Sequence, residues 1–122
     1  MTTAFDRATE AAFTAASRQA GVSVTYSAGT GDSVTVDRAI PGETMFEELS
    51  DGDVIQSWQS RDWIIRVSDL SSLTASEPTR GHRITDGTRV YEVMSPAGGK
   101  PWRFSDRGRQ WYRIHTKLVS ET

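Results

Sequence analysis

The stretch Trp111-Tyr112-Arg113-Ile114-His115-Thr116-Lys117-Leu118 decides the fold, because apolar and polar side chains alternate along most of it. Successive side chains of a β-strand point to opposite faces. One face would carry Tyr112, Ile114, Thr116 and Leu118, and the other would carry Trp111, Arg113, His115 and Lys117. We therefore predict a strand whose first face enters a core and whose second face shows a row of cationic groups behind an aromatic ring.

The rest of the composition suits a small folded domain around this strand. A chain of 122 residues fits one domain, and its eleven Trp, Phe and Tyr residues argue for a packed interior. The absence of cysteine excludes disulfides, thiolate nucleophiles and cysteine-based zinc sites. The first residues have neither a basic region nor a long apolar run, so we expect no signal peptide and no membrane span.

Charge is divided unequally along the chain. Residues 1–79 contain twelve acidic and five basic residues, whereas residues 80–122 contain nine basic and four acidic residues. Such a chain can present faces of opposite sign, suited to stacking against copies of itself, to other protein partners or to nucleic acid. The fold can equally mix the two halves over one surface.

Apolar spacing outlines the elements of a mainly β domain. Alanine and phenylalanine recur every three or four residues over 3–20, which predicts a helix that packs on its own barrel or on a neighbouring subunit. Residues 38–50 look irregular, with a turn at Pro41-Gly42, and residues 59–62 look like a hairpin turn. Strand-like runs occur at 22–26, 33–36, 54–58, 63–67, 80–84, 88–94, 102–104 and 111–118.

About seven short strands with frequent turns and one N-terminal helix predict a small antiparallel β-barrel or sandwich. We expect a single domain over residues 1–122, with the helix at 3–20 and the barrel at 22–119. The predicted core consists of Ile55, Trp63, Ile65, Val67, Ile84, Val90, Tyr91, Val93, Phe104, Tyr112 and Ile114.

No motif in the sequence indicates catalysis. Gly98-Gly99-Lys100 resembles the end of a phosphate-binding loop, but Met94 and Pro101 occupy two positions that the motif requires to be glycine and Ser or Thr. His82 and His115 are the only histidines, and neither belongs to a recognisable catalytic or metal-binding spacing. We therefore expect no enzyme, no metal and no cofactor; a small enzyme that uses His82 or His115 is the least favoured alternative.

Nucleic-acid binding is the stronger alternative. The basic residues from Arg80 onward are interleaved with Tyr91, Trp102, Phe104, Trp111 and Tyr112, and such surfaces can hold phosphates or stack bases. The opposing interpretation is that these rings form the core and the arginines face solvent or a protein partner. The mildly acidic sequence pI of about 5.6 favours this second interpretation.

Four segments resemble a known family. They are Gln59-Ser60-Arg61-Asp62-Trp63-Ile64-Ile65-Arg66-Val67-Ser68-Asp69-Leu70, Gly81-His82-Arg83-Ile84-Thr85-Asp86-Gly87 followed by Tyr91-Glu92-Val93, Pro101-Trp102-Arg103-Phe104-Ser105-Asp106, and Tyr112-Arg113-Ile114-His115-Thr116-Lys117. Together they resemble segments of tailed-phage head–tail joining proteins, also called head completion or connector proteins.

The resemblance implies a structural virion protein at the head–tail interface, assembled in the host cytoplasm. Such a β-barrel protein would dock as a ring below the portal, help to retain packaged DNA and offer a surface to the tail. Its partners would be copies of itself, the portal or an adaptor protein, and tail proteins, with possible non-specific contact with DNA and no membrane. The candidate contact residues are Arg61, Asp62, Arg80, His82, Arg103, Asp106, Arg113, His115 and Lys117.

Overall fold

A computed structural model describes residues 4–29, 31–50, 54–73, 77–96 and 99–121 of the chain. The side chains of residues 4–6, 17, 47–50 and 54–58 are outside that description. Residue 3 of the predicted helix and the side chain of the predicted core residue Ile55 therefore lie outside the described part.

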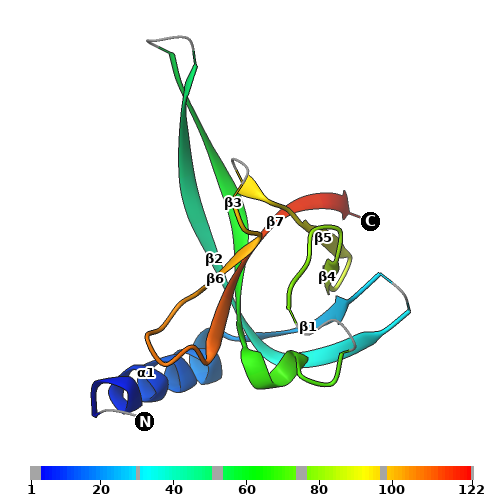
Figure 1. Cartoon of the computed structure of the whole chain (residues 1–122). Helices are drawn as coiled ribbons and strands as arrows, with labels where there is room; N and C mark the ends of the chain where they lie inside the picture. Colours follow the sequence, from blue (N-terminus) through cyan, green and yellow to red (C-terminus); the bar gives the residue numbers. More distant parts are fainter. Residues whose placement is uncertain (1–3, 30, 51–53, 74–76, 97–98, 122) are drawn as a thin grey trace.

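The fold is a closed six-stranded antiparallel barrel with one extra strand and one N-terminal helix, which confirms the predicted class (Figure 1). The strands pair in the cyclic order β1-β2-β3-β7-β5-β4, and β6 pairs with β7 outside this ring. The elements in chain order are α1 (Ala4–Ala20), β1 (Val22–Ser27), β2 (Ser33–Ser50), β3 (Val54–Arg66), the 3₁₀ helix η1 (Val67–Leu70), β4 (Arg83–Asp86), β5 (Arg89–Val93), β6 (Trp102–Phe104) and β7 (Trp111–Glu121).

The prediction that residues 38–50 are irregular is wrong, because β2 continues without a break to Ser50. A bulge in the pairing with β1 bends β2 between Val36 and Ala39, and the pairing with β1 ends at Ala39. Pro41 is tolerated inside the strand because β2 has a ladder partner on only one side from that point on.

The predicted hairpin turn at residues 59–62 is also wrong, since β3 runs through these polar residues from Val54 to Arg66. Every residue from Ile40 to Ser50 pairs with one between Ile64 and Val54. The two short hairpins suggested by the polar run are in fact one long hairpin formed by β2 and β3.

Part of this hairpin leaves the barrel. Figure 1 shows the paired ends of β2 and β3 projecting at one end of the molecule, while α1 lies at the other end. β7 pairs with β3 only from Arg66 to Arg61, so residues 54–60 of β3 have β2 as their only ladder partner. We call residues 44–50 and 54–60 the arm.

The core confirms much of the predicted set. Trp63, Ile65, Ile84, Tyr91, Val93, Tyr112 and Ile114 are buried, Val67 and Phe104 pack against the core half-buried, and Val90 is half-buried. Leu118 contradicts its predicted place on the core face, because 48% of its surface is exposed.

The helix packs on the barrel through a small contact. The ring of Phe13 stacks on Trp111 of β7 with centroids 5.4 Å apart. Ala8, Ala12 and Ala20, which belong to the predicted apolar stripe, are exposed, whereas Phe13 and Ala16 are half-buried. Packing on the chain's own barrel is thus observed, and it leaves much of the alanine stripe uncovered.

Candidate functional site

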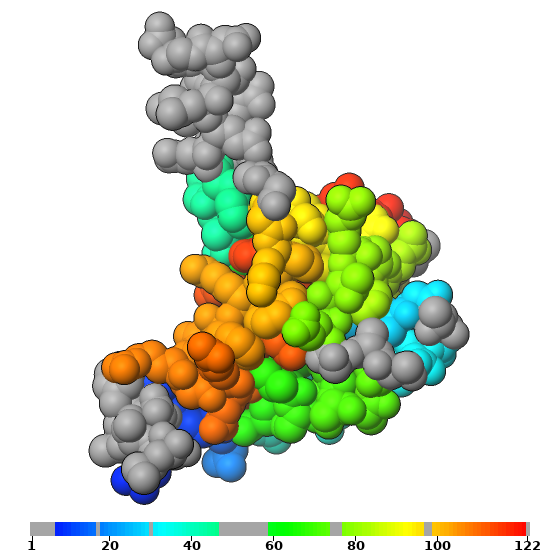
Figure 2. Space-filling model, viewed as in Figure 1, coloured from blue at the N-terminus to red at the C-terminus, as the bar shows by residue number. Residues whose placement is uncertain are grey.

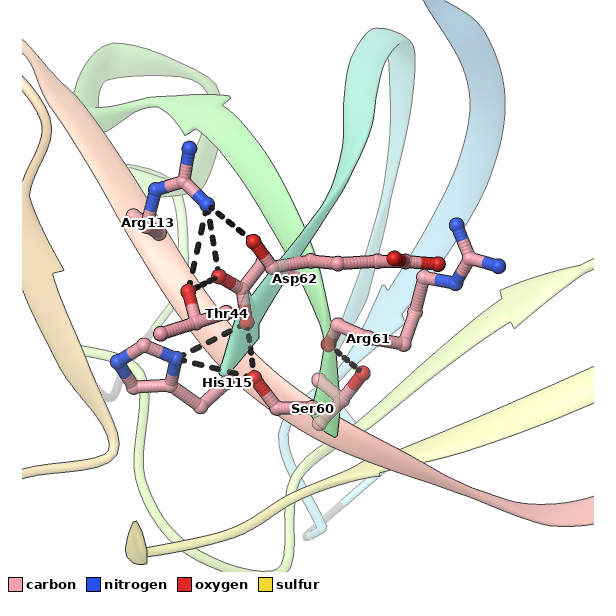
Figure 3. Close-up of polar contacts among 8 residues, drawn as sticks. Thr44, Ser60, Arg61, Asp62, Arg113 and His115 are labelled. Carbon is pink, nitrogen blue, oxygen red and sulfur yellow. Dashed lines mark hydrogen bonds and ion pairs between the residues drawn. The ribbon is translucent and has the colours of Figure 1, made fainter. Parts of the chain in front are cut away.

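A buried carboxylate holds the base of the arm to β7. Asp62 lies on β3 opposite His115, and its side chain is 0% exposed. His115 donates from Nδ1 to Oδ1 of Asp62 over 2.9 Å, and Ser60 donates to the same oxygen over 2.5 Å. Figure 3 shows both groups converging on this carboxylate.

The second oxygen of Asp62 faces two further donors. Arg113 donates to Oδ2 over 2.8 Å, and the hydroxyl of Thr44 on β2 donates to the same atom (Figure 3). Gly42 lies beside this guanidinium, and a Cβ at that position would meet Nη1 of Arg113 at 3.4 Å, an ordinary van der Waals contact. Asp62, Ser60, Thr44, Arg113 and His115 form what we call the Asp62 cluster, and its members come from three strands.

The electrostatics of the cluster favour an ionised carboxylate. Burial alone would raise the pKa of Asp62, but hydrogen bonds from the four surrounding side chains outweigh burial and hold that pKa well below its usual range. The rings of Phe46 and His115 meet nearly at right angles, with centroids 5.3 Å apart, so Phe46 helps to cover the cluster. A charge buried in this way ties the three strands together only as long as its partners remain in place.

The cluster contains Ser, His and Asp, but it lacks the geometry of a nucleophilic triad. In a triad, the acid and the nucleophile contact opposite nitrogens of the imidazole. Here Asp62 and Ser60 both face Nδ1 of His115, and Ser60 donates directly to the carboxylate. This arrangement orders side chains and does not activate the serine hydroxyl.

His82 is buried in a different, neutral environment. Its Nδ1 accepts hydrogen bonds from the Tyr26 hydroxyl over 2.7 Å and from the backbone N–H of Thr79 over 3.3 Å. Burial lowers the pKa of His82 and raises that of Tyr26, which favours the uncharged form of both rings. This pair joins β1 to the loop that precedes β4.

Trp111 is covered by the helix and is 1% exposed. Its indole N–H donates over 2.6 Å to Glu10 of α1, and Arg66 of β3 forms an ion pair with the same carboxylate. The Arg66 guanidinium also lies 4.6 Å from the centroid of the Trp111 ring. A single helical carboxylate therefore links α1 to β3 and β7.

The predicted contact residues do not form one surface. Arg80, Arg103 and Lys117 are exposed, and Arg61 is half-buried. The carboxylate of Asp106 accepts the backbone N–H groups of Gln110 and Trp111 and so shapes the turn before β7. Asp62, His82, Arg113 and His115 are engaged inside the chain, as described above.

The predicted row of exposed cations on β7 is therefore wrong in its orientation. His115 is 5% exposed, and Arg113 turns to Asp62; of the three cations, only Lys117 has an exposed side chain. Two of the partners of Asp62, Arg113 and His115, are more than fifty positions away in the sequence. Nothing local in the sequence specifies a pairing across that separation.

Two further observations concern metal binding and membrane insertion. Within the described ranges, His, Asp and Glu side chains do not gather in a group of three or more that could hold a metal ion. The helix found there lacks the length and apolar character required to cross a bilayer.

Comparison with known proteins identifies the relationship suggested by the four motifs. Residues 3–122 match the sequence model of a family described as phage head-tail joining protein. The match covers nearly the whole chain, including the helix and first hairpin, where motifs had given no indication. A search of curated proteins found no significant match.

Proposed function

Because this chain belongs to the phage head–tail joining protein family, we propose that it is a head completion or connector subunit that docks as a ring below the portal. In that position it helps to retain the packaged genome and presents the attachment surface for the tail. The family match over residues 3–122 carries this proposal, since it extends through every element of the fold.

The shape of the subunit supports a connecting role. α1 and the arm lie at opposite ends of the barrel, so contacts can be made on two well-separated sides (Figure 1). The barrel between them is closed by backbone pairing and needs no partner to complete its sheet. A subunit of this kind can meet the portal or an adaptor protein on one side and tail proteins on another.

The exposed basic residues are proposed as protein contacts. Arg80, Arg103 and Lys117 are exposed, Arg80 and Lys117 line one hollow of the surface, and Arg61 lies half-buried at the base of the arm. Arginine is well suited to planar, two-pronged bonding with carboxylates, so acidic surfaces of partner proteins would fit these positions. DNA within the channel is the second proposed partner for the same charges.

A dedicated nucleic-acid-binding module is less well supported. Base stacking requires exposed aromatic faces. Tyr91, Trp111 and Tyr112 are buried, while Trp102 and Phe104 are half-buried against Tyr112. Most of the rings that suggested stacking are therefore used for packing.

Docking can be tested with DNA-filled, tail-less heads that carry a portal. Added protein should bind to the portal vertex, be visible there as a ring by electron microscopy, and protect the packaged DNA from added nuclease. It should also allow purified tails to join the heads. Protein that leaves nuclease sensitivity and tail joining unchanged, and that does not sediment with heads, would contradict the proposal.

A further inference from the structure

A groove lies where the arm leaves the barrel. It has a volume of about 400 Å³, and its charged lining consists of Arg61 of β3, Arg89 of β5, Lys117 of β7 and the acidic residues Glu43 of β2 and Glu121 of β7, beside the apolar Leu118. One wall is the base of the arm, and the other is the last part of β7. Figure 2 shows the red C-terminal end of the chain at the molecular surface.

The two strands that form these walls, β3 and β7, do not pair with each other along the groove. The ladder between β3 and β7 ends at the pair formed by Arg61 and Thr116. Beyond it, β7 pairs only with β5 and residues 54–60 pair only with β2, so the strands diverge (Figure 1). Strand edges of this kind bind extended segments of other chains.

The side chains of the groove favour an acidic, partly apolar occupant. Among the described residues, neither Arg61 nor Lys117 forms an ion pair, whereas Arg89 is paired with Glu121. Leu118, which lines the groove, is 48% exposed although it belongs to a barrel strand. The two unpaired cations therefore outnumber Glu43, the one acidic residue of the lining outside these ion pairs, and they lie beside the exposed Leu118.

The chain itself carries a segment of matching character. Residues 42–60 include Glu43, Glu47, Glu48, Asp51 and Asp53 and contain no basic residue. The same stretch includes the apolar residues Met45, Phe46 and Leu49, and Met45 is 61% exposed. At about 3.3 Å per residue, strand residues 44–50 extend roughly 20 Å from the base of the arm.

A second copy of the chain can supply this occupant, whereas the arm of the same chain cannot. Seven consecutive pairs between β2 and β3 hold the arm extended, and the groove lies at its own base, so an arm cannot fold back into it. Like charge would also make the arms repel one another and repel the DNA phosphates. On these grounds, and resting on the proposed ring, we propose that the groove of one subunit receives the acidic arm of a second copy of this chain.

Charge reversal on each side of this contact tests the inference. Wild-type protein and three variants would be bound to the portal-bearing heads, and the protein retained after washing would be quantified. Arg61→Glu with Lys117→Glu should reduce retention at least tenfold, and Glu47→Lys with Glu48→Lys should do the same. The variant that combines all four changes should recover to within about threefold of wild type, because attraction is restored between copies.

Lys100→Glu provides the matched control, since Lys100 is an exposed lysine that does not line the groove. It should be retained like wild type, and thermal unfolding should verify that every variant is folded. The arm-in-groove contact would be overturned if the Arg61/Lys117 double variant were retained as well as wild type. It would also be overturned if the variant with all four changes were retained no better than either double variant. Failure of wild-type protein to bind heads would instead overturn the proposed docking itself.

A cross-linking measurement requires no variant. A carbodiimide joins lysine amines to carboxylates that form ion pairs, and protein mixed from light and heavy isotope labels distinguishes links within a chain from links between chains. On assembled heads, links between Lys117 and the arm should include mixed-label pairs at about half of the total. The absence of mixed-label links would contradict the proposal.

Discussion

The alternating run Trp111–Leu118 extends across both halves of β7, but the two halves have opposite surroundings. Residues 111–116 are buried on both faces except for Arg113, which is half-buried, whereas residues 117–121 are all exposed. The first half pairs with β3 on one side and is covered by α1 and by Phe46 of β2. The second half pairs with β5 alone.

The difference shows that burial along this strand depends on its neighbours and not on its own pattern. Alternation predicts that His115 and Lys117 share a surface, and that Ile114 and Leu118 share a core. In the fold, His115 and Ile114 are buried, while Lys117 and Leu118 are exposed. The boundary lies where β3 leaves β7, immediately after Thr116.

The largest effect is expected from removing the carboxylate that secures this boundary. Asp62→Ala should lower the free energy of unfolding by about 3–5 kcal/mol, because Arg113 and His115 would lose their buried partner. Urea denaturation would measure the loss, and Asp37→Asn on the exposed side of β2 serves as control. A loss below about 1 kcal/mol would contradict the role assigned to the cluster.

A matched pair of truncations compares the two halves directly. Ile114→Ala should cost about 2–5 kcal/mol because it opens a cavity in the core. Leu118→Ala should change stability by no more than about 0.5 kcal/mol, as is usual for exposed positions. Equal losses for the two variants would show that the end of β7 is buried in the isolated protein after all.

The contact between α1 and the first half of β7 can be weakened without disturbing the barrel core. Glu10→Ala removes the acceptor for Trp111 and the partner of Arg66, and should cost about 1–2 kcal/mol. Amide hydrogen exchange should accelerate in α1 and remain slow in β4 and β5. Glu77→Ala, at an exposed loop position, is the control and should leave exchange in α1 unaltered.

The smallest effect is expected from pH and concerns the histidine outside β7. Because burial lowers the pKa of His82 in the folded chain, the unfolded chain binds the proton more readily. The stability that the neutral His82 contributes to the fold is fully present above the unfolded pKa of about 6.5 and decreases as the pH falls through that value. Stability measured from pH 8 to pH 5 should fall less steeply in His82→Gln; an identical slope would contradict the neutral pairing with Tyr26.

Sequence reasoning predicted the core of the barrel well because core residues alternate over short distances. Ile84, Tyr91 and Val93 illustrate this, since each lies in a strand that is only four or five residues long. It failed on the long strands β2 and β3. Pro41 and the polar residues 59–62 are typical of turns when considered alone. They adopt strand conformation because β2 and β3 pair with each other through these positions.

The candidate site was harder to predict than the core. Asp62, Arg113 and His115 were all predicted as contact residues for a partner, whereas in the fold Arg113 and His115 donate to the buried carboxylate of Asp62. Hydrogen bonds across more than fifty residues depend on strand register, which local composition does not contain. The groove beside Lys117 could not be predicted from local sequence either, because it arises where β3 and β7 diverge.

By itself, the sequence determined the β class, the helix, most core positions and the family, because these depend on alternation, spacing and short motifs. The tertiary structure alone decided which part of the strand Trp111–Glu121 is interior and which part is surface. A strand presents two faces and two edges, and its own residues cannot specify what covers them. Here α1 and the base of the arm cover the first half, and the departing β3 leaves the second half open.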